Sequence, residues 1–191
     1  RRLSGGDTQE LLKLFRALLI LAAAYFVFEV CFAEFAGLFS AIDALKAGNS
    51  AFTTDTVLPA ATDITGSKSL VFSYVVLALR FAAEVLPTLL AAATAYFAIG
   101  LLDTMEDGAF TQESAAYAPK LAEWCVKVLK LSVLLALAVN LLQAVCAPLI
   151  LSTSISIRLP VLELCFVLAA LLGARLIASN VALAADSDLF I

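Results

Sequence analysis

Residues 70–100 form an apolar segment that is long enough to cross a lipid bilayer, yet it contains Arg80, Glu84 and Pro87. A helix of about 20 apolar residues spans the hydrocarbon core. A charge left in hydrocarbon costs from about 3 to more than 10 kcal/mol, so both charged side chains should face protein or water. Because they are four residues apart, they share one helix face and can pair, and Pro87 predicts a kink beside them.

The overall composition places this segment in a membrane protein. Hydrophobic residues make up 63% of the 191 residues, and the mean hydropathy is +1.02. A soluble domain has an apolar content of about 45–50%. We therefore expect an all-α, polytopic membrane protein, a four-helix transmembrane bundle of two helical hairpins that forms a single domain over residues 1–191. The predicted spans are 14–41, 70–100, 121–147 and 159–185, with an outer loop at 43–69.

Two segments outside these spans have the composition of strands, at residues 52–58 and 151–157. In a four-span topology both lie on the same side of the membrane. They could pair as a small cap, or they could remain two unpaired loops.

The distribution of basic residues predicts the orientation. Lys46, Lys68 and Arg158 fall on one side of the membrane, and a larger group falls on the other: Arg1, Arg2, Lys13, Arg16, Lys120, Lys127, Lys130 and Arg175. Cytoplasmic loops carry an excess of basic residues. We therefore expect a multi-pass protein of the cell inner membrane with both termini in the cytoplasm.

Polar residues within the spans are the candidate ligand-binding residues. They are Glu29, Arg80, Glu84, Asn140, Gln143 and Glu163. Glu34 also lies in the first span, but in an α-helix it points about 140° away from Glu29, so the two should not share a partner. The excess of carboxylates over Arg80 predicts a pocket for a cationic or amphiphilic small molecule. The alternative is a structural role, in which hydrogen bonds between helices contribute about 0.6–2 kcal/mol each.

Other chemistry is missing from the sequence. Histidine is absent, and there is no nucleophile with a base, no cluster of metal ligands, no glycine-rich phosphate loop and no basic tract for nucleic acid. We expect no enzyme, no catalytic or metal-binding residues and no cofactor. Cys31, Cys125, Cys146 and Cys165 lie in apolar surroundings and are interpreted as small buried hydrophobic residues, although a disulfide among three of them, Cys31, Cys146 and Cys165, stays open.

Two short motifs carry a resemblance to a known family. Residues 106–111, Glu-Asp-Gly-Ala-Phe-Thr, resemble the short G-x-P-F-T turn after the second span of an uncharacterised family of bacterial four-span inner-membrane proteins, known as a domain of unknown function. Residues 186–191, Asp-Ser-Asp-Leu-Phe-Ile, resemble its acidic, apolar tail. Ala109 replaces the proline, and Phe190 stands where the tail usually has threonine. The resemblance implies a small membrane protein often encoded beside a helix-turn-helix regulator, and it implies no catalytic residues.

Two classes of function remain open on the sequence. A small regulatory or sensor-type membrane protein would use the polar residues in its spans, and its partners would be the lipid bilayer and a cytoplasmic regulatory protein. A transporter component is the alternative, and it would need a dimer or a partner subunit because four spans are few. Small residues spaced four apart, such as Ala169 and Gly173, could pack against another helix of the same chain or, in a homodimer, against a second copy.

Overall fold

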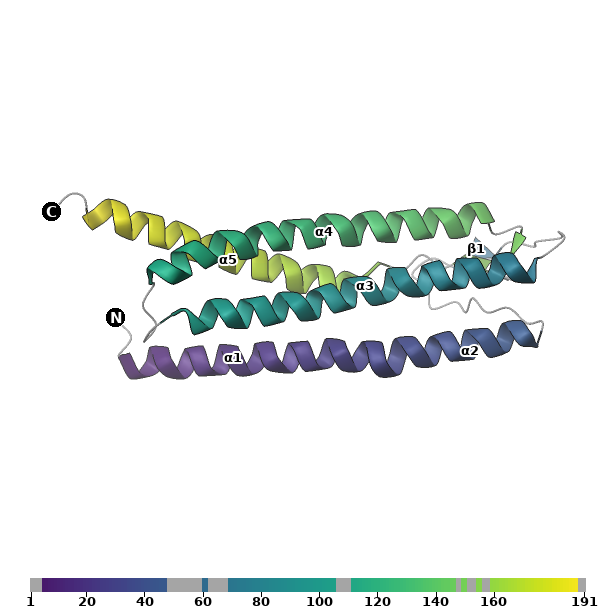
Figure 1. The fold of residues 1–191 in the computed structure, drawn as a ribbon, viewed down its shortest axis with the longest axis horizontal. Helices are drawn as coiled ribbons and strands as arrows, with labels where there is room; N and C mark the ends of the chain where they lie inside the picture. The colour runs from purple at the N-terminus through teal and green to yellow at the C-terminus, as the bar shows by residue number, and fades with distance from the viewer. Residues whose placement is uncertain are drawn as a thin grey trace. The chain divides into compact units, whose positions relative to one another are not determined.

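The computed structural model describes residues 5–47, 60–61, 69–105, 111–146, 149–150, 154–155 and 159–188. Helices α1 (Gly5–Phe28), η1 (Glu29–Glu34) and α2 (Phe35–Lys46) follow one another without a gap. The other helices are α3 (Leu70–Asp103), α4 (Gln112–Cys146) and α5 (Val161–Asp188) (Figure 1). These four long helical segments confirm the predicted all-α, four-helix architecture.

The four segments are long and apolar enough to cross a membrane. The candidate spans are Gln9–Lys46, Leu70–Asp103, Glu113–Cys146 and Val161–Asn180. Many of their large apolar side chains point outward; Leu21, Phe32 and Val71 are 66%, 62% and 72% exposed. A surface of this kind is unfavourable in water and suits the acyl chains of lipid. The chain therefore has the helices of a multi-pass membrane protein.

The first helical segment extends further than the sequence predicts. Residues 43–46 are helical and do not yet belong to the outer loop, which was predicted to begin at residue 43. The Nζ atom of Lys46 lies 3.2 Å from Oδ1 of Asp43, three residues earlier, so this exposed pair supports the last helical turn. The predicted loop boundary is wrong because a polar turn can extend an apolar helix into water.

The chain forms two compact units that both take residues from separate parts of the sequence. Unit 1 consists of Arg1–Val27, Leu89–Lys130 and Leu162–Ile191, and unit 2 consists of Phe28–Thr88 and Leu131–Val161. Helices α3 and α4 each contribute to both units. In unit 1 the beginning of α1 and the end of α5 lie at the same end (Figure 1). The single domain over residues 1–191 stays a prediction.

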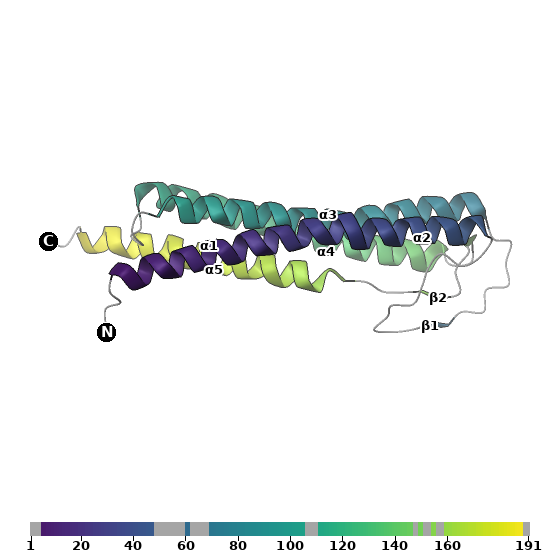
Figure 2. The same cartoon turned by 90° about the horizontal axis from the view of Figure 1, so that it is seen from below.

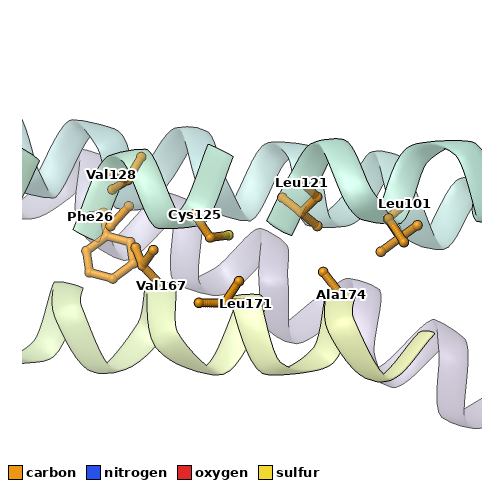
Figure 3. Packing of buried hydrophobic residues seen from close by; sticks show 10 residues of the cluster. Phe26, Leu101, Leu121, Cys125, Val128, Val167, Leu171 and Ala174 are labelled. Carbon is orange, nitrogen blue, oxygen red and sulfur yellow. The ribbon is translucent and has the colours of Figure 1, made fainter. Parts of the chain in front are cut away.

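Unit 1 has an apolar core to which four helices contribute (Figure 3). Phe26 of α1 packs with its ring edge against Phe166 of α5, with 5.2 Å between the ring centroids. Trp124 of α4 donates a hydrogen bond from Nε1 to Oγ1 of Thr94 in α3, at 3.1 Å. The core residues are Phe26, Ala91, Leu101, Ala118, Leu121, Cys125, Val128, Val167, Leu171 and Ala174. Small residues among them let the helix backbones approach closely.

Unit 2 has a smaller core and a short strand pair. Leu45 of α2 packs with Val76 and Leu77 of α3 and with Ile150. Strands β1 (Ala60–Ala61) and β2 (Ser154–Ile155) pair antiparallel, with Ala60 opposite Ile155 (Figure 2). The two loops thus pair over two residues each, and β2 lies within the predicted segment 151–157, whereas β1 lies outside the predicted segment 52–58. The first predicted segment, 52–58, lies outside the described residues, and β1 follows it.

The space around two helical glycines, Gly100 of α3 and Gly173 of α5, predicts how alanine at each position changes the stability of the protein. A Cβ atom at Gly100 would lie 2.8 Å from the Tyr117 hydroxyl oxygen, whereas a Cβ at Gly173 meets nothing within 4 Å. Alanine is favoured over glycine in a helix by about 1 kcal/mol. We expect Gly173→Ala to raise the thermal midpoint in detergent, and Gly100→Ala to lower it because overpacking costs roughly 1–3 kcal/mol. Adding Tyr117→Phe to Gly100→Ala should restore stability, and equal midpoints for the two alanine variants would contradict this packing.

Candidate functional site

Arg80 and Glu84 form an ion pair on α3, as their spacing predicts. Nε of Arg80 donates to Oε1 of Glu84 at 2.9 Å, and the two side chains are only 10% and 20% exposed. Phe81, between them in sequence, packs edge-on against Phe35 of α2, with 5.1 Å between the ring centroids. The pair is therefore held within unit 2, away from the most exposed helix faces.

The helix continues through Pro87, three residues after Glu84. Proline has no N–H to donate to the carbonyl four residues earlier, so a local weakness in the backbone ladder is expected there. Pro87 is buried, and α3 remains helical on both sides of it. The hydroxyl of the buried Thr88 donates to the Glu84 carbonyl oxygen at 3.1 Å. This hydrogen bond ties the turn containing Pro87 to the ion-paired residue.

The first span contains a π-helical turn that sequence reasoning missed. Helix η1 begins at Glu29 and ends at Glu34, and the Phe35 N–H donates to the carbonyl oxygen of Val30, five residues back. Hydrogen bonds of this type place residues i and i+5 one turn apart on the same side. The prediction that Glu29 and Glu34 diverge by about 140° is therefore wrong, because it assumed an α-helix. Such turns are frequent at functional sites, and the two glutamates within an apolar run were the available signal.

Two amides on α4 complete the polar part of unit 2. Gln143 is 2% exposed, and its Nε2 atom is buried with no hydrogen-bond partner in the described part of the chain. Asn140, three residues earlier, is half-buried. A buried donor without a partner costs about 1–3 kcal/mol. Gln143 therefore offers one strong hydrogen-bonding position to a molecule that enters this region.

Glu163 does not belong to the same unit as the other candidates. It lies in the first turn of α5, is 9% exposed and falls within unit 1. A carboxylate at this position interacts favourably with the positive end of the helix dipole. The structure brings the other five candidates, Glu29, Arg80, Glu84, Asn140 and Gln143, into unit 2. We call these five residues the polar cluster.

The helical segments of unit 2 carry more acidic than basic residues. Among residues 28–47, 69–88 and 131–146, the acids are Glu29, Glu34, Asp43 and Glu84, and the bases are Lys46 and Arg80. The exposed pair of Asp43 and Lys46 stands apart at the helix end, so three carboxylates accompany one guanidinium deeper in the segments. Across the described residues, no group of three or more metal-binding side chains is arranged to hold a metal ion.

The four cysteines are free thiols. Cys125 is buried, Cys146 is half-buried, and Cys31 and Cys165 are exposed. The interpretation of all four as buried residues is therefore correct for Cys125 and wrong for Cys31 and Cys165, whose thiols lie on outward helix faces. A thiol is small and apolar enough to face lipid.

The ion pair generates the second prediction. Removing one partner of a buried pair costs roughly 3–5 kcal/mol, because the other charge stays buried, whereas replacing both by apolar residues is often neutral. We expect Arg80→Met and Glu84→Leu each to lower the thermal midpoint in detergent strongly. The double variant should recover most of that loss. Single variants as stable as the parent protein would contradict a buried pair, and the exposed pair Glu123 and Lys127 offers the control.

We compared the chain with protein families, curated proteins and solved structures. No family model, no curated protein and no solved structure matches the chain. The resemblance to the uncharacterised four-span family stays a prediction.

Proposed function

We propose that the chain is a small regulatory or sensor-type protein of a bacterial inner membrane, and that its input is a small amphiphilic molecule bound at the polar cluster. Both termini face the cytoplasm in this proposal, where a regulatory protein would receive the signal. Helices α3 and α4, which carry Arg80, Glu84, Asn140 and Gln143, continue into unit 1, to which both chain ends belong. A change at the cluster therefore has a continuous helical route toward the termini.

The observation that carries this proposal is the amide of Gln143. Buried polar groups in native proteins nearly always have a hydrogen-bond partner, so an exception calls for an explanation. Nε2 of Gln143 is buried and has no partner within the described residues. A ligand with a hydrogen-bond acceptor would supply that partner.

The charge of unit 2 indicates the second feature of the ligand. Glu29, Glu34 and Glu84 accompany a single guanidinium in the deeper segments. A carboxylate in an apolar region becomes more favourable when a cation is near. A molecule with a cationic group and an acceptor oxygen fits these two requirements, and an apolar tail suits the apolar helices around them.

Decanoylcholine is a suitable probe because it combines a quaternary ammonium, an ester carbonyl and an alkyl chain. We expect it to raise the thermal midpoint of the purified protein in a nonionic detergent, since a ligand at 100 times its Kd stabilises the folded state by about 2.7 kcal/mol. Gln143→Leu should abolish this shift, and without probe it should leave stability unchanged or raised, because it removes an unsatisfied buried amide. Ethyl decanoate, which lacks the cation, is the ligand control.

The matched protein control is Asn180→Leu, which removes an exposed amide of α5 in unit 1. It should keep the full response to decanoylcholine. The proposal is contradicted if Gln143→Leu destabilises the protein and still responds to the probe, because that result assigns Gln143 a structural role. Glu84→Gln is an independent test: poorer folding with an unchanged response to decanoylcholine would exclude a binding role for Glu84.

The proposed orientation has a separate test. A reporter enzyme that is active only in the cytoplasm, fused after Ile191, should be active in cells, because most basic residues near the span ends then lie in the cytoplasm. The same reporter inserted in the loop between α2 and α3 should be inactive. The reverse pattern would overturn the orientation and leave the ligand proposal standing.

A further inference from the structure

A hollow in unit 1 lies between helices α4 and α5, and none of its lining residues belongs to the polar cluster. Its volume is about 500 Å³, and its lining residues are Pro119, Ala122, Glu123, Val126, Arg175, Ala178 and Ser179. Four of the seven are apolar, and the charged and polar ones are Glu123, Arg175 and Ser179. The hollow thus combines an apolar wall with a single guanidinium.

Among the charged residues that line the hollow, Arg175 is the one that can pair with a charged ligand. Nζ of Lys127 lies 2.7 Å from Oε1 of Glu123, so the carboxylate already has a cation beside it. None of the ion pairs among the described residues involves Arg175. The Ser179 hydroxyl donates to the Arg175 carbonyl oxygen at 2.9 Å, so its oxygen can only accept a further hydrogen bond. The hollow therefore offers a positive charge for an anion and an acceptor for a neighbouring hydroxyl.

The position along the helices suits the level of lipid headgroups. The hollow begins at Pro119, next to the start of the predicted span 121–147, so Arg175 lies against the beginning of the apolar part of α4. Trp124, next to Glu123, is a half-buried indole of the kind that gathers at membrane interfaces. Leu172 and Leu176 of α5 are 55% and 64% exposed and give an apolar surface near Arg175. An arginine at this depth can extend its guanidinium toward the headgroups while its stem stays in lipid.

We propose that this hollow is a binding site for an anionic glycerophospholipid such as phosphatidylglycerol. The headgroup phosphate pairs with Arg175, the headgroup glycerol donates to the Ser179 oxygen, and the acyl chains lie along the outward leucines of α5. Basic pockets between membrane helices on the cytoplasmic side recognise anionic headgroups in this way. The site is independent of the polar cluster and of the proposed sensor function.

Native mass spectrometry of the full chain in mixed micelles tests the proposal. We expect one phosphatidylglycerol to be retained in preference to phosphatidylcholine, and Arg175→Gln to weaken this preference about five-fold, as expected for one basic residue near the surface. Lys120→Gln, which removes an equal charge from an exposed site on α4 outside the hollow, should retain the preference.

Three other results of the mass spectrometry experiment would overturn the proposal. Equal retention of both lipids excludes a headgroup site, an equal loss in Lys120→Gln assigns the preference to general surface charge, and displacement of the lipid by inorganic phosphate alone assigns the hollow to a free anion. If Arg175→Gln does not fold, Ser179→Phe replaces it, because it fills the hollow from an exposed position and keeps every charge. That variant should fold normally and lose the preference for phosphatidylglycerol, and retention of the preference would contradict the site.

Discussion

The ion pair of Arg80 and Glu84 is the interaction that most constrains how unit 2 can be built. An unpaired charge in a helix of this hydropathy would be too costly, so each residue depends on the other and on a surrounding wall of protein. Phe81, next to Arg80 on α3, contacts Phe35 of α2 through its ring edge. Unit 2 also contains Glu29 of η1 and the amides of Asn140 and Gln143 of α4. The buried pair thus places two charged side chains within apolar helices.

The two units divide the chemistry of the chain between them. Unit 1 is closed by an apolar core in which alanines and Cys125 allow close packing, and its polar contacts, such as that of Trp124 with Thr94, join one helix to another. Unit 2 has a core of few residues and holds five of the six candidate ligand-binding residues. The larger apolar core lies in unit 1, whereas unit 2 contains the buried amide of Gln143, which has no partner among the described residues.

Sequence reasoning could predict whatever depends on composition and on α-helical spacing. The four helices follow from apolar segments of sufficient length, and the pairing of Arg80 with Glu84 follows from their spacing of four. The π-turn could not be predicted, because a backbone changes its hydrogen-bond pattern for reasons of packing between helices. The assignment of Glu163 to another unit also depends on how α5 packs, which no local pattern specifies. The burial of Gln143 without a partner among the described residues also depends on packing between helices, so the sequence pattern could not predict it.

The π-turn also determines where the first helical segment tolerates a change in length. Val30 is buried, and Ile42 packs against the core of unit 2 twelve residues later. A π-turn takes up one extra residue, so the remaining eleven steps correspond to about three α-helical turns and put both side chains on one face. Deleting Ala33 would leave an ordinary α-helix with the same two residues still aligned. A deletion elsewhere in α1 or α2 would rotate everything beyond it by about 100°, so η1 is where this helix can shorten without turning its buried face outward.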